Sequence, residues 1–352
     1  MIMVKRKITW KEGMRKLFFC FIFLLMAASL MLPSAPGAKN RERSVLFLWW
    51  NVENLFDTSN DPQTEDDDFT PGGKLQWTEK KLLLKQMRLR HLMTAVEAHP
   101  KYRKYPDLLA FAEVENQKVF QETLDQLQDI TYKTIYYESP DPRGIDIALA
   151  YNPLTLLAGA SKAYSVPLGR RTRKIVVAGF FAEGHPFHVI LNHWPSRSFD
   201  TAWTEQKRMA AATVTRHILD SLLVGHPKAD IIVMGDFNDE AANNSLTQVL
   251  GSTFDAERVR SGNGKFIFNC WSGYEGIGSY FFNNHWQQID HILLSAGMLD
   301  HSGLSAAQGA FECFCFPKLL DGKKPYATYE KRKYKGGYSD HLPLLLKATI
   351  SR

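Results

Sequence analysis

Polar side chains that could do acid–base or metal chemistry stand at the ends of six apolar runs in this sequence. Each run is rich in β-branched and aromatic residues, and is therefore typical of a buried β-strand. Side chains at strand ends project from a rigid scaffold, which is where catalytic groups are usually held. Six such positions in register argue for one shared site. They are Asn51, Glu113, Asn192-His193, Asp236-x-Asn238, Asp290-His291 and Asp340-His341.

These residue types suit chemistry at phosphorus. Hydrolysis of a phosphoester needs an oriented water, stabilisation of negative charge on the phosphoryl oxygens and help for the leaving oxygen. A histidine held by a carboxylate keeps one tautomer and can donate to a phosphate or take a proton, and His341 is the candidate. A hard cation prefers carboxylate, carbonyl and water oxygens, and Glu113 is the best candidate ligand. We interpret Glu115, two residues later, as an exposed loop carboxylate rather than as a metal ligand.

The elements between these positions predict a layered α/β domain. Strands are expected over residues 45–50, 107–112, 145–151, 174–181, 186–191, 231–234, 289–294 and 342–350, with a hairpin turn at Glu183-Gly184. Helices are expected over residues 77–98, 119–127 and 204–223, and a weak one over 244–250. Strands interleaved with a few helices suggest two sheets packed face to face, with helices outside. No linker rich in Pro and Gly divides residues 39–352, which we interpret as one domain.

The motifs in this order resemble the endonuclease/exonuclease/phosphatase superfamily, of the deoxyribonuclease I-like kind. The resemblance covers roughly residues 44–350, and it implies a four-layered αββα sandwich of two mixed β-sheets flanked by helices. It identifies the chain as a bacterial secreted member. The motifs are Asn51-Val-Glu-Asn54, Glu113-Val-Glu115, Gly144-Ile-Asp-Ile-Ala-Leu149, Asn192-His-Trp194, Gly235-Asp-Phe-Asn238, Asp290-His291 and Ser339-Asp-His341.

The resemblance also implies a role for most of these residues. Glu113 would bind a divalent metal, Mg²⁺ or Mn²⁺ with Ca²⁺ as a further choice, beside Asn51 and Asp340. Asp290 would hold His341, Asp236 would orient or deprotonate the attacking water, and Asn238 would donate to a phosphoryl oxygen. The sequence leaves open whether Asp236 or His341 is the base.

His193 would be a second histidine over the phosphate, as in the deoxyribonuclease and sphingomyelinase branches. Asp146 could orient it, and a capping or surface aspartate is the alternative. Asn192, Arg143 and Trp286 are predicted substrate-binding residues, although for Arg143 an exposed loop side chain is the alternative.

The first 38 residues have the order of a secretory signal peptide. A basic segment precedes the apolar run from Leu17 to Leu32, and small residues and prolines follow it. We therefore expect export to the periplasm or beyond, with a signal anchor in the membrane as the alternative. Removal of residues 1–38 would leave 37 basic and 36 acidic residues, so the net charge of +6 falls to +1 and gives no support to nucleic-acid binding.

Which phosphoester is cleaved depends on loops. Nucleic acid is the first candidate, because basic clusters at 170–174 and 331–335 and the aromatic residues around Trp286 could contact phosphates and bases. A lipid or sugar phosphodiester is the second, since the apolar segment 311–317 could make a transient membrane contact, although a buried strand is the preferred interpretation of that segment. A non-catalytic binding protein is the third. No obligate protein partner is inferred. The cysteines beyond the expected signal peptide, Cys270, Cys313 and Cys315, are expected to be buried or free thiols. The acidic run Glu65–Asp68 is expected to be a surface loop, with cation binding as the alternative.

Overall fold

The computed structural model describes residues 43–198 and 201–351, which lie within one compact unit. The predicted signal peptide, residues 1–38, lies outside the described residues. Two seven-stranded sheets dominate this unit. Within its described parts, no helix is both long and apolar enough to cross a bilayer.

The first sheet has the order β14-β20-β1-β2-β4-β3, and β15 pairs with β20 beside this path. It is mixed, because β1 runs parallel to β2 and antiparallel to β20. Its strands are β1 (Ser44–Leu55), β2 (Leu108–Val114), β3 (Lys133–Tyr136), β4 (Asp146–Tyr151), β14 (Leu304–Ser305), β15 (Phe311–Cys313) and β20 (Leu344–Ile350).

The second sheet has the order β5-β6-β7-β8-β13-β10-β9. It is also mixed, because β7 and β8 are parallel whereas β13 runs antiparallel to β8. Its strands are β5 (Leu156–Tyr164), β6 (Ile175–Ala182), β7 (His185–His193), β8 (Asp230–Asp236), β9 (Ser252–Thr253), β10 (Ile267–Asn269) and β13 (Asp290–Leu294).

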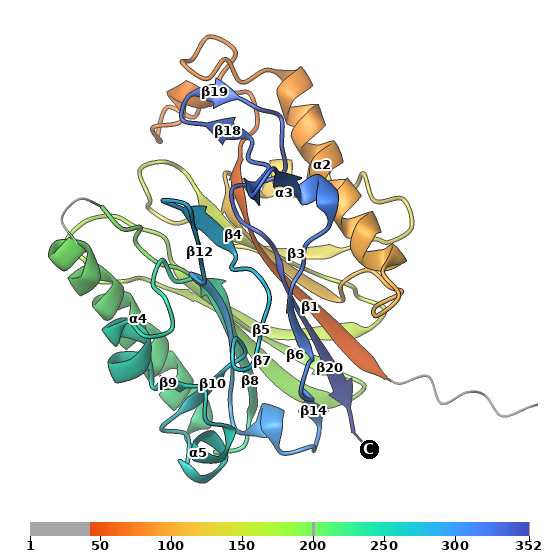
Figure 1. Cartoon of the computed structure of the whole chain (residues 1–352), viewed down its shortest axis with the longest axis vertical. Helices are drawn as coiled ribbons and strands as arrows, with labels where there is room; N and C mark the ends of the chain where they lie inside the picture. Colours follow the sequence, from red (N-terminus) through yellow and green to blue (C-terminus); the bar gives the residue numbers. More distant parts are fainter. Residues whose placement is uncertain (1–42, 199–200, 352) are drawn as a thin grey trace, which may run out of the picture. The chain divides into compact units, whose positions relative to one another are not determined.

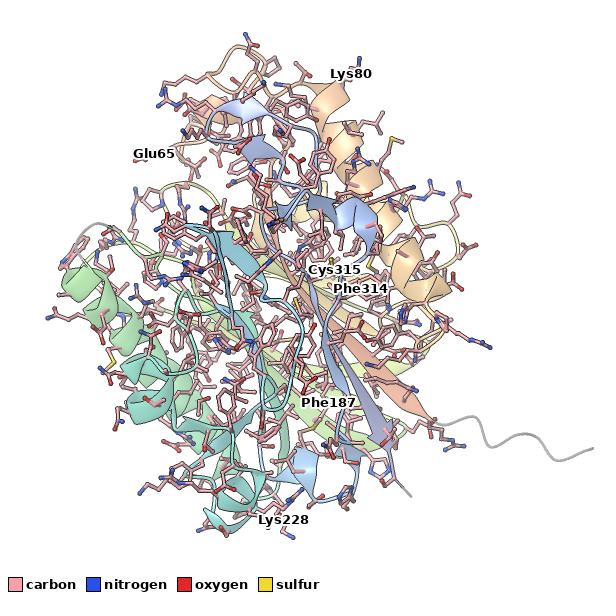
Figure 2. The ribbon with its side chains drawn as sticks, in the orientation of Figure 1. Glu65, Lys80, Phe187, Lys228, Phe314 and Cys315 are labelled. Atoms are coloured by element: carbon pink, nitrogen blue, oxygen red, sulfur yellow. The ribbon has the colours of Figure 1, made fainter. Side chains whose placement is uncertain are left out.

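The two sheets pack face to face with helices outside, as the sequence predicted (Figure 1). The ring of Phe47 on β1 meets that of Phe187 on β7 edge-on at 5.6 Å, and both side chains are fully buried. Figure 2 labels Phe187 among the side chains of this core. Because helices cover the outer faces, the central strands are buried on both sides. This explains why β1 and β8 are continuous apolar runs rather than alternating ones.

Helices α2 (Glu79–Ala98) and α3 (Gln117–Leu124) flank the first sheet, and Asn116 caps α3 by accepting from the N–H of Val119. Helix α4 (Thr201–Leu223) packs through Ala211, Ile218 and Leu219 on the second sheet. The predicted weak helix is a π-helix, η2 (Ser245–Leu250), and α5 (Ala256–Ser261) follows. Three 3₁₀ turns complete the set: η1 (Asp67–Phe69), η3 (Gly297–Leu299) and η4 (Pro317–Leu319).

Three small hairpins lie outside the main sheets. Strands β11 (Tyr280–Phe282) and β12 (His285–Gln287) form the first. The other two are β16 (Leu320–Asp321) with β17 (Lys324–Pro325), and β18 (Tyr329–Glu330) with β19 (Lys333–Tyr334). These hairpins come from the two long stretches that the sequence leaves without predicted elements.

All eight predicted strands and the three main helices are present, with ends shifted by a few residues. Strand β5 escaped prediction because Ala158-Gly-Ala160 interrupts its β-forming residues at the edge of the sheet. The segment 311–317 includes the buried strand that the sequence favoured over a membrane contact: Phe311, Cys313 and Phe314 are buried beside β20. Cys270, Cys313 and Cys315 are free thiols, as expected.

Candidate active site

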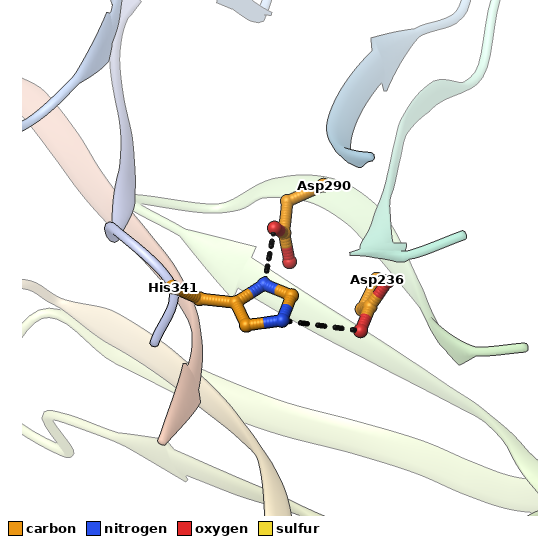
Figure 3. Close-up of side chains that lie close together, drawn as sticks. All are labelled: Asp236, Asp290 and His341. Carbon is orange, nitrogen blue, oxygen red and sulfur yellow. Dashed lines mark hydrogen bonds and ion pairs between the residues drawn. The ribbon is translucent and has the colours of Figure 1, made fainter. Parts of the chain in front are cut away.

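His341 and Asp290 form the hydrogen-bonded pair that the sequence predicted. The two residues are 51 positions apart in the sequence, and His341 Nδ1 lies 2.7 Å from Asp290 Oδ2 (Figure 3). Burial alone would lower the pKa of His341, but the nearby Asp290, Asp340 and Asp236 carboxylates outweigh it and hold that pKa well above its usual value. These surroundings therefore favour the protonated imidazolium of His341, whose Nε2 lies 3.9 Å from Asp236 Oδ2.

Asp236 ends strand β8 directly opposite Asp290 in the β8–β13 ladder. One of its oxygens, Oδ2, accepts a hydrogen bond from Asn51 Nδ2 at 3.1 Å and lies 3.9 Å from His341 Nε2. Burial, with a further contribution from Asp290, raises the pKa of Asp236 to about 7. A carboxylate in this range can both hold and accept a proton near neutral pH, as a general base must.

His193 stands on the other side of Asp236 at the end of β7. Its Nε2 is 3.8 Å from Asp236 Oδ2 and 3.8 Å from Glu113 Oε1. Burial, followed by the charges of Arg173 and Arg143, holds the pKa of His193 well below its usual value, so this ring is neutral. The site therefore contains one charged and one neutral histidine.

The suggestion that Asp146 orients His193 is wrong. The Asp146 carboxylate accepts from Tyr136 Oη at 3.0 Å and from the N–H of Ser139 at 2.9 Å. His193 Nδ1 is buried without a hydrogen-bond partner among the described residues. A neutral imidazole in this position is free to take either tautomer.

Glu113 and Asp340 meet the requirements of a cation site. Glu113 Oε2 accepts from the N–H of Asn54, which leaves Oε1 facing the centre of the site. The Asp340 carboxylate accepts no hydrogen bond from the described residues, and burial with the like charges of Glu113 and Asp236 raises its pKa to about 6. Desolvated carboxylates with unused oxygens are the donors that hard divalent cations prefer.

The backbone at this edge is bent to bring these side chains together. The pairing of β1 with β2 is interrupted between Asn51 and Leu55, and that of β2 with β4 between Ala112 and Val114. Asn54 and Glu113 have positive φ angles of 61° and 65°. Non-glycine residues rarely adopt this region, and such outliers cluster at functional sites. Asn51 lies at the edge of the bulge, where its Oδ1 accepts from the N–H of Glu53.

Asp236, Asp290 and His341 also form a group that could hold a metal ion, since one ligand atom of each lies within 4.8 Å of the others. However, the two Asp290 oxygens accept hydrogen bonds from Trp49 Nε1, Ser279 Oγ and His341 Nδ1. The geometry therefore favours Asp290 as the partner of His341, and Glu113 with Asp340 as the ligands.

Arg173 belongs to the basic cluster 170–174, which the sequence offered as a contact to nucleic-acid phosphates, but its burial within the site could not be predicted. It is buried, and donates from Nη1 to Asp141 Oδ2 at 3.0 Å and from Nη2 to Trp194 O at 2.8 Å. Its Nε is buried without a partner among the described residues. Asn238, which has a positive φ of 52°, donates from Nδ2 to the same carbonyl of Trp194 at 3.1 Å. This bond uses one of its two amide hydrogens.

The three predicted substrate-binding residues have different positions. The prediction that Asn192 binds substrate needs correction, because Asn192 is fully buried. Its Oδ1 accepts from Trp194 Nε1 and from Thr215 Oγ1, so its amide connects helix α4 to the second sheet. Arg143 is largely exposed and paired with Asp141. Trp286 is half-buried on β12, where its ring packs edge-on against Phe281.

The β11–β12 hairpin lies against His341. The ring of Tyr280 is centred 4.7 Å from that of His341, and the two backbones form an isolated bridge. Phe282, two residues on, stacks in parallel with Tyr280 and is 51% exposed. The sequence raised these aromatics as stacking candidates, and the structure brings them to the edge of the site.

A buried lysine ties this edge of the sheet to helix α2. Lys85 donates from Nζ to Thr328 Oγ1 at 2.5 Å and to Tyr338 O at 2.7 Å, and lies 3.3 Å from Glu53 O. Glu53 accepts from the N–H groups of Thr328 and Tyr329. Burial lowers the pKa of Lys85 and raises that of Glu53. The pair holds the chain that leads into Asp340 and His341, and no sequence motif marks Lys85.

The fold and the site together define a phosphoester hydrolase of layered α/β architecture. A sequence model described as "Endonuclease/Exonuclease/phosphatase family" matches residues 46–349, and the chain belongs to this family. Enzymes of the family generally use divalent metals, and the buried group of two aspartates and a histidine is present here. No curated protein matches the chain.

Several solved structures share the fold. The human Nocturnin catalytic domain with bound sulfate anion is 15% identical, with 88% of this chain and 96% of that chain covered and a TM-score of 0.53. A truncated Caenorhabditis elegans TDP2 is 15% identical, with 88% and 98% covered and a TM-score of 0.55. D. rerio TDP2 complexed with single strand DNA product is 15% identical, with 87% and 99% covered and a TM-score of 0.52. At these identities the likeness is one of fold.

The opposite charge states of the two histidines give a first prediction. His341 is expected to stay protonated above pH 6.5, and His193 to stay neutral below it, in an NMR titration of the ring signals. The Asp290→Asn variant should lower the pKa of His341, because it removes the largest contribution that raises it.

The same shift makes a prediction for stability. A pKa raised by folding stabilises the fold below the unfolded value near 6.5, and this contribution is lost as pH rises through the folded value. The excess unfolding free energy of wild type over Asp290→Asn should therefore shrink toward alkaline pH. A His341 pKa that is unchanged in Asp290→Asn would contradict the assignment of the pair.

Proposed function

We propose that the chain is a divalent-metal-dependent phosphodiesterase that cleaves nucleic acid, most simply as an endonuclease. The observation that carries the proposal is the arrangement around Asp236. The Nε2 atoms of His193 and His341 lie 3.8 Å and 3.9 Å from Asp236 Oδ2, and Asp290 is directly opposite Asp236 in the β8–β13 ladder. Such a constellation serves to activate water and to stabilise charge on a phosphate.

In the mechanism we propose, Asp236 orients a water molecule and takes its proton as the oxygen attacks phosphorus. His341, kept protonated by Asp290 through Nδ1, gives its Nε2 proton to the leaving oxygen as the P–O bond breaks. His193 Nε2 and the free amide hydrogen of Asn238 donate to the phosphoryl oxygens. This assigns the base, which the sequence left open, to Asp236.

Glu113 and Asp340, with Asn51 beside them, are the residues that would hold the cation, Mg²⁺ or Mn²⁺ before Ca²⁺. Bound there, a divalent cation supplies positive charge that stabilises the phosphoryl oxygens in the transition state. A site with only two protein carboxylates suits a small cation such as Mg²⁺, which retains several water ligands.

Nucleic acid is supported as the substrate by the surroundings of the site. Tyr280 and Phe282 offer stacked aromatic faces next to His341, where bases that flank the cleaved phosphate can stack. Buried Arg173 and the largely exposed Arg143 add positive charge on the His193 side. A structural relative from D. rerio is complexed with a single strand DNA product. We further propose that the enzyme is exported through residues 1–38 and acts without an obligate protein partner.

Metal removal tests the proposed activity directly. Purified protein should degrade single-stranded and plasmid DNA with Mg²⁺ or Mn²⁺, and EDTA should abolish the activity because without the cation the carboxylates repel the phosphate. Sphingomyelin and inositol phosphates are the comparison substrates, measured by phosphate or headgroup release. Undiminished cleavage in EDTA, or activity confined to the comparison substrates, would overturn the proposal.

Substitution of the acid and base tests the mechanism. His341→Ala and Asp236→Asn should each lower kcat about 10²- to 10⁴-fold, the usual value of a positioned acid or base. The matched control is His226→Ala at an exposed histidine, and circular dichroism checks that each variant folds. A near-normal kcat in either variant would refute the role assigned to that residue.

Removal of the aromatic faces tests substrate binding. Tyr280→Ala and Phe282→Ala should each raise KM for single-stranded DNA about tenfold, because each stacked base is worth about 1–3 kcal/mol. Hydrolysis of dimethyl phosphate, which has no base, should change little with Phe282→Ala. Phe254→Ala is the matched control, since Phe254 is 50% exposed on the segment between β9 and α5. Equal effects on both substrates would mean that the hairpin shapes the site and does not bind bases.

A further inference from the structure

The segment that follows β7 leads from His193 at the catalytic centre to Arg197. Its first residue, Trp194, is only 1% exposed, and the N–H of Trp194 donates to the carbonyl of Asp236 at 2.9 Å. The carbonyl of Trp194 accepts from Asn238 Nδ2 at 3.1 Å. These bonds fix the start of the segment to the site, and Arg197 follows three residues later in the chain.

Arg197 contacts the β11–β12 hairpin. Its Nη2 donates to Gln287 Oε1 on β12 at 2.6 Å. Gln287 is paired with Tyr280 across the hairpin, and the ring of Tyr280 is centred 4.7 Å from that of His341. The guanidinium of Arg197 therefore lies beside the hairpin that carries the aromatic faces and contacts the proposed acid.

The positive charge of Arg197 has a neutral protein partner. Arg143 and Arg173 both form ion pairs with Asp141, whereas Arg197 forms none among residues 43–198 and 201–351, and its partner Gln287 is an amide. Arg197 is exposed, so its remaining N–H groups face solvent. A planar guanidinium with donors to spare matches the geometry of a phosphate group.

Most exposed arginines are simply solvated, but the position of Arg197 is specific. Its segment begins at His193, and the hairpin that it contacts lies against His341. Both histidines face the same carboxylate, that of Asp236, at 3.8 Å and 3.9 Å. Arg197 thus connects the two structural elements that border the position of the cleaved phosphate.

We propose that Arg197 binds a phosphate that flanks the cleaved one, and that it makes the enzyme prefer chains with at least two phosphodiester groups. This inference rests on the nuclease function proposed above. A strand whose bases stack on Tyr280 and Phe282 brings a neighbouring phosphate to the edge of the site, where Arg197 supplies positive charge and hydrogen-bond donors. Arg197 acts in substrate selection, since it does not touch the reacting atoms.

Two short substrates test the preference. A dinucleotide has one phosphodiester and no flanking phosphate, whereas a trinucleotide has a flanking phosphate beside either bond. Arg197→Gln should lower kcat/KM for the trinucleotide about tenfold, mainly by raising KM, because one charged hydrogen bond is lost. It should leave kcat/KM for the dinucleotide near the wild-type value.

Arg258→Gln is the matched control for the change of charge. Arg258 is an exposed residue of α5, which lies at the other end of the second sheet from the β11–β12 hairpin (Figure 1). This variant should leave kcat/KM for both substrates at the wild-type value.

The salt dependence of binding gives a readout that a purely structural role would not change. The Kd of a labelled single-stranded oligonucleotide is measured over a range of salt concentrations at one fixed Mg²⁺ concentration, in the slowly cleaving Asp236→Asn background. Each phosphate contact contributes about 0.7 to the slope of log Kd against log salt on a single strand. Arg197→Gln should lower the slope by about 0.7, and Arg197→Lys, which keeps the charge, should retain it.

Gln287→Leu separates phosphate binding from support of the hairpin. It breaks the bond between Arg197 and Gln287 but keeps the charge, so the salt slope should stay at the wild-type value. An Arg197→Gln variant that loses the same factor on dinucleotide and trinucleotide, or that retains the wild-type salt slope, would refute the proposal and leave the nuclease function standing. A wild-type enzyme that cleaves neither these substrates nor DNA would refute the nuclease function itself.

Discussion

The buried carboxylate of Asp290 is the interaction on which the site depends. Asp290 begins β13 in the second sheet, yet its oxygens accept from Trp49 Nε1 of β1 in the first sheet, from Ser279 Oγ and from His341 Nδ1. One side chain thus joins the two sheets and the chain that leads into β20. A buried charge is tolerated only when it is paired and hydrogen-bonded, so the three donors and the position of His341 are mutually required.

Asp290 also influences the charge states of the residues around it. Asp290 stabilises the proton on His341, and its own charge, with burial, makes Asp236 harder to ionise. Arg173 and burial keep His193 neutral a few ångströms away. The acid, the base and the neutral donor of the proposed mechanism can therefore coexist at one pH because each has a different environment. This arrangement costs folding stability, because it buries several charges and bends the strand ends. Hydrogen bonds from Lys85 to Tyr338 O and from the N–H of Thr328 to Glu53 hold the neighbouring chain in place.

Much of this could be predicted from sequence, for physical reasons. Strands such as β1 and β8 are unbroken apolar runs, and the polar residue that ends each one lies at the same edge because the sheet aligns them. Residues whose role is set by distant packing could not be predicted. Asn192 was taken for a substrate ligand because it precedes His193, but it bonds to Thr215 of α4. Arg173 and Lys85 look like any exposed basic residue in sequence, and only the fold buries them.

The central claim is that water, activated by Asp236, attacks phosphorus. Single-turnover cleavage of a DNA oligonucleotide in ¹⁸O-labelled water tests it most directly, with mass spectrometry of both product ends. We predict one ¹⁸O atom in the phosphate group of the product and none in the released hydroxyl. Label in the hydroxyl would indicate cleavage of the C–O bond, and label in neither product would indicate transfer or elimination. Either result would contradict the account.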